Sequence, residues 1–137
     1  MSSSKPNVMP KKYEREAHVK QAVKAILDAH NWFWWMPAAN GMGTTGVSDF
    51  CALKAGCFIA IETKFGKNPA TPLQKAFLTS VRATDNFAFL VSETTVDYLK
   101  AYIEAFDRAT EAALKKQDVS PEDGAMMLNA IRVLSDY

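Results

Sequence analysis

The chain is poor in cysteine and has no long hydrophobic run. Cys51 and Cys57 are its two cysteines, and no second pair is present to complete a four-ligand zinc site. We therefore expect neither a disulfide framework nor structural zinc. No stretch approaches the ~18 consecutive apolar residues of a membrane-spanning helix. Residues 1–16 also lack a hydrophobic segment followed by a cleavage site, so the sequence predicts a cytoplasmic protein with no membrane association.

An overall excess of one charge is also missing, because the net charge of the 137 residues is +1. Hydrophobic residues make up 48% of the chain and charged residues 23%, which is close to the composition of globular proteins and too apolar for a disordered chain. A chain of this length corresponds to one ordinary domain.

The charges are unevenly distributed along the chain. Residues 1–24 carry six basic and two acidic side chains, residues 47–82 carry five and two, and residues 83–137 carry five and ten. Phosphate binding needs local rather than overall positive charge, so the first two thirds of the chain can face a polyanion. Ordinary solvated helix faces explain the acidic last third at least as well.

Hydrophobic periodicity and turn residues predict an α/β fold with a mixed sheet. Residues 1–11 show no period and are expected to form a flexible tail. We expect helices over residues 12–30, 71–83, 95–116 and 121–135, and strands over residues 32–36, 47–53, 57–65 and 87–91. The strand at 32–36 is apolar on both faces, which predicts that both faces are covered. The apolar stripe within residues 96–106 either packs on the sheet or joins two subunits.

Two carboxylates and a lysine form the sharpest chemical feature. Asp49 and Glu62 fall on the two strands of one predicted hairpin, and Lys64 projects from the same face as Glu62. Neighbouring carboxylates resist a shared ionised state unless a cation lies between them, and hard oxygen ligands favour Mg²⁺ or Mn²⁺. Alternating charges on a strand usually form a solvent-exposed face. The apolar residues before Glu62 instead indicate a central strand, so we favour a metal site suited to phosphodiester hydrolysis.

Three segments together resemble the PD-(D/E)XK nuclease superfamily and, more narrowly, its VRR-NUC family. They are Gly46-Val47-Ser48-Asp49-Phe50, Phe58-Ile59-Ala60-Ile61-Glu62-Thr63-Lys64 and Thr71-Pro72-Leu73-Gln74-Lys75-Ala76-Phe77-Leu78. The resemblance covers about residues 14–92. It implies a restriction-endonuclease-like nuclease core of helix, three-stranded meander, helix and strand over residues 12–92, with residues 93–137 as a C-terminal helical extension of the same domain. The chain departs from the family at Ser48, where a proline is usual, and it has no run of the Val-Arg-Arg kind.

The resemblance also implies which residues carry the chemistry. Asp49 and Glu62 would hold the metal with the main-chain carbonyl of Thr63. Lys64 would position or activate the attacking water and stabilise the charge that grows on the phosphate.

Two further residues are assigned by the same resemblance. Glu16 matches the family's glutamate on the first helix better than Glu14 does. Gln74 would support the site from the start of the next helix. A glutamine three residues after a threonine cap also satisfies a main-chain N–H without any catalytic role, and both interpretations of Gln74 remain open.

Candidate nucleic-acid contacts are basic or polar side chains near these motifs. Phosphate contacts carry no sequence information, so such a set favours recognition of DNA shape, although most of the lysines would be ordinary solvated surface. The tryptophans of the 32–36 strand either pack in the core or offer a stacking platform for bases. The candidate contacts are Lys11, Lys12, Arg15, Lys20, Asn40, Thr44, Thr45, Lys67 and Lys75.

The resemblance therefore implies a Mg²⁺-dependent (or Mn²⁺-dependent) endodeoxyribonuclease acting on branched DNA, like the enzymes that resolve Holliday junctions. Many small members of the family occur in phages and prophages, so the expected location is a bacterial or phage-infected cell. Symmetric cutting of two strands needs two active sites and predicts a homodimer. The alternatives are a catalytically inactive DNA-binding module with the nuclease fold, a flap-type nuclease, and a non-nuclease metal protein or regulatory partner.

Overall fold

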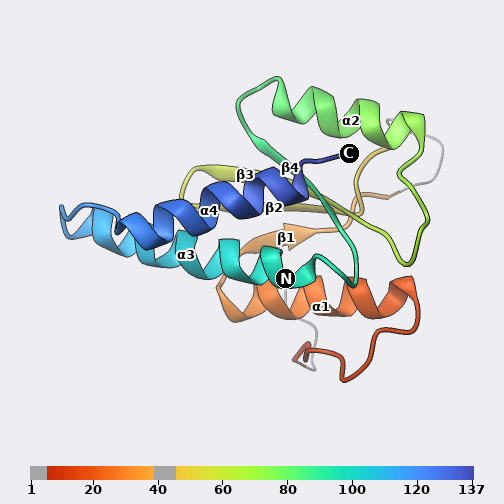
Figure 1. Ribbon diagram of the computed structural model, residues 1–137, viewed down its shortest axis with the longest axis horizontal. Coiled ribbons are helices and arrows are strands. Elements are labelled where there is room, and N and C mark those ends of the chain that lie inside the picture. The colour runs from red at the N-terminus through yellow and green to blue at the C-terminus, as the bar shows by residue number, and fades with distance from the viewer. Residues whose placement is uncertain (1–5, 39–45) are drawn as a thin grey trace.

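The computed structural model describes residues 6–38 and 46–137, which form a mixed α/β fold (Figure 1). The elements in chain order are α1 (Glu16–Ala29), β1 (Phe33–Trp35), β2 (Phe50–Lys54), β3 (Cys57–Thr63), α2 (Pro72–Arg82), β4 (Phe87–Val91), α3 (Val96–Leu114) and α4 (Pro121–Leu134). Their order and type are those expected from the sequence. The largest shifts are at the starts of α1 and β2, which begin several residues later than expected. Within the described ranges, none of the helices is long and apolar enough to cross a membrane.

The four strands form one mixed sheet in the order β1-β2-β3-β4. The first three strands are antiparallel to their neighbours, and β4 runs parallel to β3. In the β2–β3 hairpin Phe50 lies opposite Ile61, and in the parallel pair Glu62 lies beside Leu90. The long central strand β3 is therefore bonded on both sides, as its apolar sequence predicts.

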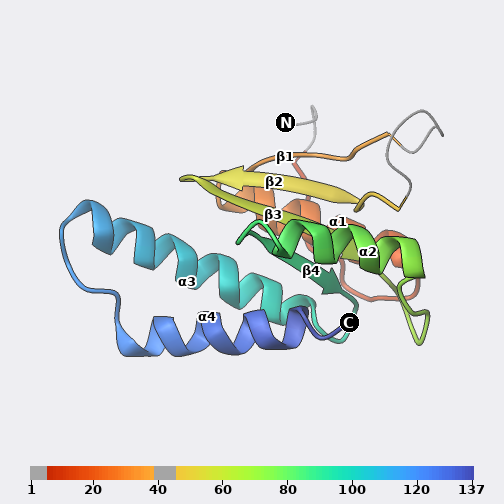
Figure 2. The same cartoon turned by 90° about the horizontal axis from the view of Figure 1, so that it is seen from above.

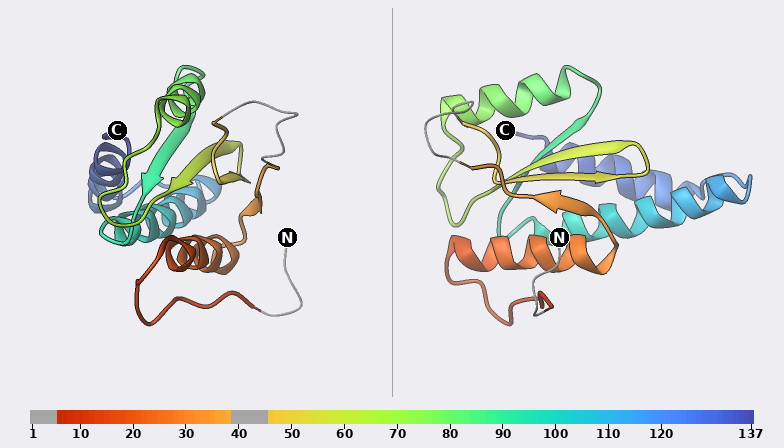
Figure 3. Two further views of the ribbon diagram at one scale, coloured as in Figure 1. Left: turned by 90° about the vertical axis from the view of Figure 1, so that its right-hand side faces the viewer. Right: turned by 180° about the vertical axis from the view of Figure 1, so that it is seen from behind.

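Helices cover the two faces of the sheet unequally (Figure 3). One face packs on α1, α3 and α4 in the main hydrophobic core, to which β3 contributes Ile59 and Ile61. The other face packs on α2 through a smaller cluster of Ala60, Leu78 and Ala88. Figure 2 shows α3 and α4 lying side by side as an antiparallel pair. The apolar stripe of α3 is buried in the main core, so it packs within the chain.

The aromatic strand β1 differs from expectation, because it lies at the edge of the sheet and one of its faces is open. The Phe33 side chain is 54% exposed, whereas Trp32 and Trp34 are buried. The prediction that both faces of this strand are covered is therefore wrong. The physical reason is that α2 covers one face of the sheet over β3 and β4, as the residues of the smaller cluster indicate. On the same face, the part formed by Phe33, Trp35 and the cross-strand neighbour Leu53 is left open.

The segment before α1 is joined to that helix although it forms neither helix nor strand. The Asn7 side chain donates to Asp28 Oδ2 at 2.7 Å, and Gln21 Nε2 donates to the Val8 carbonyl at 2.8 Å. Arg15 is extended and forms the N-cap of α1. The helix consequently begins at Glu16, which becomes its first residue.

Candidate active site

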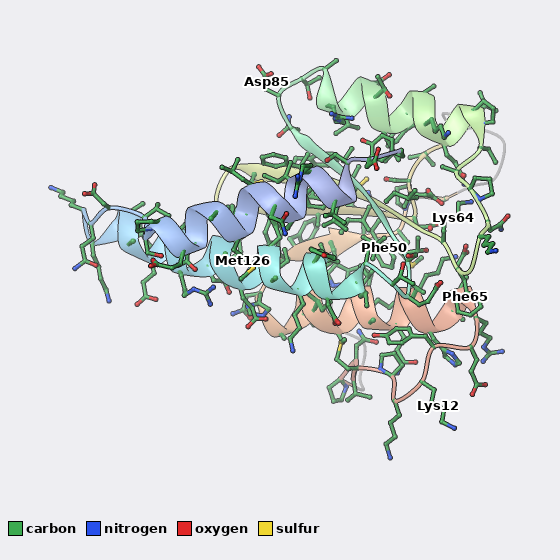
Figure 4. The ribbon with its side chains drawn as sticks, in the orientation of Figure 1. Lys12, Phe50, Lys64, Phe65, Asp85 and Met126 are labelled. Atoms are coloured by element: carbon green, nitrogen blue, oxygen red, sulfur yellow. The ribbon has the colours of Figure 1, made fainter. Side chains whose placement is uncertain are left out.

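The predicted site residues meet at the end of the sheet where β3 ends and β2 begins. Figure 4 shows Lys64 and Phe65 on the chain that leaves β3, with Phe50 of β2 nearby. α1 approaches this end of the sheet from one face, and the start of α2 approaches it from the other. The open end of the β2–β3 hairpin and the N-terminal parts of α1 and α2 therefore meet at the candidate site.

Asp49 is held against the last residue of β3. Its Oδ2 accepts two hydrogen bonds from Thr63, one from the main-chain N–H at 2.9 Å and one from Oγ1 at 2.6 Å. Because Phe50 lies opposite Ile61, the register places Asp49 opposite Glu62. A side-chain carboxylate thus occupies the position where the ladder of main-chain hydrogen bonds would continue, which explains why β2 begins at Phe50 and not at residue 47.

Glu62 is a buried carboxylate with one oxygen left unpaired. Its residue is 3% exposed, and Oε1 accepts a hydrogen bond from Gln74 Nε2 at 3.0 Å. Oε2 is buried and has no hydrogen-bond partner among the described residues. Burial, reinforced by the negative charge of Asp49, raises the pKa of Glu62 to about 8, although the Lys64 ammonium opposes the shift. Glu62 therefore stays neutral at pH 7 unless a cation joins it.

Gln74 caps α2 and also contacts the buried carboxyl group of Glu62. Its Oε1 accepts the main-chain N–H of Thr71 at 2.9 Å, while Thr71 Oγ1 accepts the Gln74 N–H, so the pair forms a capping box at the start of α2. The amide nitrogen of the same side chain donates to Glu62. One residue thus caps the helix and orients a buried carboxyl group.

The Gly46-Val47-Ser48-Asp49 segment is shaped by contacts on either side of Asp49. Gly46 has a φ of +78°, and a Cβ built on it would lie 2.6 Å from the main-chain carbon and oxygen of Leu73 in α2. Only glycine fits this close approach without displacing the helix. Ser48 is 2% exposed and its Oγ donates to the Phe50 carbonyl at 2.9 Å. The Ser48 side chain therefore shapes the backbone just before β2 through a local hydrogen bond.

Glu16 and Lys20 are the residues of α1 that lie at the site. Lys20 Nζ lies 3.3 Å from Glu16 Oε2 and 3.8 Å from Asp49 Oδ1. Partial burial opposes its charge, but Asp49 and Glu16 outweigh that effect and raise the Lys20 pKa. Lys20 was expected to contact nucleic acid, but its ammonium lies between two carboxylates. It contacts both Glu16 and Asp49, and so links α1 to the segment before β2. The spacing of four residues on one helix face is the sequence signal that points to this pair.

The other described nucleic-acid candidates are exposed, and their side chains form no ion pair or hydrogen bond with Asp49, Glu62 or Lys64. Their side chains are exposed in the segment before α1, in the loop after β3 and in the first turn of α2. Figure 4 places Lys12 on the N-terminal segment, well away from Lys64. Asn40, Thr44 and Thr45 lie outside the described residues. The exposed set is Lys11, Lys12, Arg15, Lys67 and Lys75.

The oxygen atoms at the site fit a hard divalent cation. Glu62 Oε2 has no hydrogen-bond partner among the described residues, and Asp49 Oδ1 lies 3.8 Å from the Lys20 ammonium. The Thr63 carbonyl faces the same side as the Thr63 N–H that binds Asp49, because both groups of a strand residue point to one neighbour. No group of three or more His, Cys, Asp or Glu side chains gathers at a potential metal site in residues 6–38 and 46–137. Any ion here would be held by two carboxylates and a main-chain carbonyl, with water completing the shell, as Mg²⁺ prefers.

No family model, curated protein or solved structure matches the chain. The site itself is therefore the basis for a functional assignment.

Proposed function

We propose that the chain is a metal-dependent endonuclease that hydrolyses phosphodiester bonds in branched or otherwise structured DNA, as a small relative of the PD-(D/E)XK nucleases of VRR-NUC type. The observation that carries this proposal is the unpaired Oε2 of Glu62, buried beside Asp49 and two residues before Lys64. A buried carboxylate oxygen with no partner costs free energy unless the group binds a proton or a metal ion.

A divalent cation resolves this electrostatic conflict. The burial of Glu62 and, next to it, the charge of Asp49 raise the pKa of Glu62 to about 8, so that its protonated form predominates at pH 7. An ion between the two carboxylates would allow Glu62 to ionise as well, since a nearby opposite charge favours the charged form of a group. Mg²⁺ or Mn²⁺ bound there would polarise a phosphoryl oxygen and lower the pKa of a bound water.

The protein's own residues would then orient the reactants. Lys64 is half-buried and close enough to Glu62 to oppose the rise in its pKa. Its ammonium would hold the attacking water or a phosphate oxygen and stabilise the negative charge that develops there. Gln74 and Thr63 keep Glu62 and Asp49 in place through hydrogen bonds. The resemblance implies that cleavage leaves a 5′ phosphate.

DNA would approach the open end of the sheet. Lys67 and Lys75 are exposed on the loop after β3 and on the first turn of α2, where they can contact phosphates flanking the scissile bond. The acidic excess of residues 83–137 would repel a polyanion from α3 and α4. We propose a homodimer, because two sites are needed to cut two strands of a junction symmetrically.

The test is cleavage of linear duplex, single-stranded, flap and four-way junction DNA by the purified chain, with Mg²⁺, with Mn²⁺ and with chelator. We expect metal-dependent cutting of branched substrates and a loss of at least ~100-fold in Glu62→Gln and Lys64→Met. Glu111→Gln and Lys115→Met are matched controls, because those residues form an exposed pair on α3, and both should cut at the wild-type rate.

The outcomes separate the proposal from its competitors. Cleavage that persists in Glu62→Gln or Lys64→Met would contradict the site assignment. Junction binding without cleavage under any metal would identify a DNA-binding module that has lost catalysis. Cutting of flaps but not of four-way junctions would place the chain among flap-type nucleases.

A further inference from the structure

Lys20 is the member of the site whose position the sequence did not predict. The spacing of four residues places its ammonium on the same side of α1 as Glu16, and the same ammonium lies 3.8 Å from Asp49 Oδ1. Its side chain is 31% exposed, so it lies at the rim of the site and is not freely solvated. The Lys20 ammonium thus lies between the carboxylate of Glu16 on α1 and that of Asp49, just before β2.

The remaining oxygen atoms define how many cations the site can hold. Asp49 Oδ2 accepts two hydrogen bonds from Thr63, and Glu62 Oε1 accepts one from Gln74. Asp49 Oδ1 and Glu62 Oε2 are left to bind one cation between them. Glu16 and Asp49 would be the carboxylates for a second cation, and Lys20 already lies within 4.0 Å of both.

We propose that the Lys20 ammonium takes the place of a second metal ion, so that the chain binds one divalent ion per active site. This inference rests on the proposed nuclease function for its catalytic meaning. In two-metal phosphodiesterases the ions lie about 3.5–4 Å apart and stabilise the attacking and leaving oxygens. An ammonium at the second position supplies positive charge to the phosphate without a coordination shell, and it repels a further divalent ion.

The number of bound ions is measurable without DNA. We would titrate the wild-type chain with Mn²⁺, follow free Mn²⁺ by electron paramagnetic resonance, and repeat the titration with Mg²⁺ by calorimetry. We expect about one ion per wild-type chain and about two per Lys20→Met chain, because removing the ammonium frees Glu16 and Asp49 to bind a second ion. Glu16→Gln in the Lys20→Met background should return the count to about one.

Lys24→Met is the matched control, since Lys24 lies one turn further along α1, and it should keep the wild-type count. Circular dichroism would check that each variant is folded. The wild-type count tests the inference without any variant, so a misfolded Lys20→Met chain would not leave it undecided.

The results distinguish this inference from the proposed function. A wild-type chain that cleaves DNA and binds two ions, or a folded Lys20→Met chain that still binds one ion, would overturn the role of Lys20 and leave the nuclease proposal standing. One bound ion per chain with no cleavage of any DNA substrate would support the inference of one ion per site and contradict the proposed nuclease function. A wild-type chain that binds no divalent ion would overturn both.

Discussion

The side chain of Gln74 joins the N-terminal cap of α2 to the buried carboxyl group of Glu62. Its Oε1 accepts the Thr71 N–H at 2.9 Å while its Nε2 donates to Glu62 Oε1 at 3.0 Å. The two groups of one amide therefore serve helix stability and site geometry separately, and different substitutions can remove one without the other.

Gln74→Glu should keep the cap and damage the site. A glutamate at this position still accepts the Thr71 N–H, so we expect the free energy of unfolding to stay within about 1 kcal/mol of wild type. It cannot donate to Glu62, and we expect DNA cleavage to fall roughly 10-fold to 100-fold. Urea denaturation and cleavage assays measure the two effects.

Thr71→Ala is the reciprocal control. It removes the hydroxyl that accepts the Gln74 N–H but leaves the amide that donates to Glu62. We expect it to lose about 1 kcal/mol of stability and to retain cleavage. Wild-type cleavage by Gln74→Glu would mean that Gln74 only caps the helix.

The stability of the metal-free protein should depend on Glu62 over a defined pH range. The Glu62 pKa is raised from its ordinary 4.5 to about 8 in the folded chain, so the folded state keeps a proton that the unfolded state releases. The contribution of Glu62 is therefore complete below about pH 4.5 and is lost as the pH rises toward 8. The expected slope is of the order of 1 kcal/mol per pH unit, measured by urea denaturation in chelator.

Two comparisons identify the source of that slope. Glu62→Gln should remove it, whereas Glu111→Gln, at a side chain that is 66% exposed, should leave it unchanged. Saturating Mg²⁺ should stabilise the protein at pH 8, because the ion binds the ionised carboxylates of the folded state. A slope that persists in Glu62→Gln would show that another group titrates.

Gly46→Ala should destabilise the chain far more than Gly56→Ala. Both glycines have a φ of +78°, but a Cβ at Gly46 would meet the Leu73 main chain at 2.6 Å, whereas nothing lies within 4 Å of one at Gly56. We expect a cost of about 1 kcal/mol at Gly56 from the backbone conformation alone and roughly 3 kcal/mol at Gly46, where a steric clash is added. Thermal unfolding of the two variants measures the difference, and equal costs would contradict the contact with α2.

Thr63→Val should separate the positioning of Asp49 from the packing of β3. The substitution preserves the shape of a fully buried side chain but removes the hydroxyl that donates to Asp49 Oδ2 at 2.6 Å. We expect about 1–2 kcal/mol of lost stability and a fall of roughly 10-fold in cleavage. Thr63→Ser keeps the hydroxyl and should cleave at nearly the wild-type rate, and equal rates for both variants would show that the main-chain N–H alone positions Asp49.

The parts of the fold that follow from local sequence were predictable. The β2–β3 hairpin was predicted from its alternating residues, and its register in the structure places Asp49, just before β2, opposite Glu62. The Thr71–Gln74 capping box was visible as a start signal for α2, because its two members are three residues apart. The identity of these residues as catalytic groups stays a prediction.

The parts that depend on how elements pack were not predictable. Periodicity shows that α1 is amphipathic, but it does not show that the helix lies beside the start of β2 and brings Lys20 to Asp49. The apolar sequence of β1 indicates a strand without indicating that α2 leaves its Phe33 face open. The expected start of β2 at residue 47 failed because the Asp49 carboxylate replaces a main-chain acceptor, which no propensity scale describes.

The residues of the candidate site come from four separate segments of the chain. Glu16 and Lys20 come from α1, Asp49 precedes β2, Glu62 is the second-last residue of β3 and Gln74 lies in the first turn of α2. No fragment that ends before α2 therefore contains the whole set. A fragment ending at residue 70 would therefore keep the proposed metal ligands Asp49, Glu62 and Thr63 but lack the Gln74 amide that donates to Glu62.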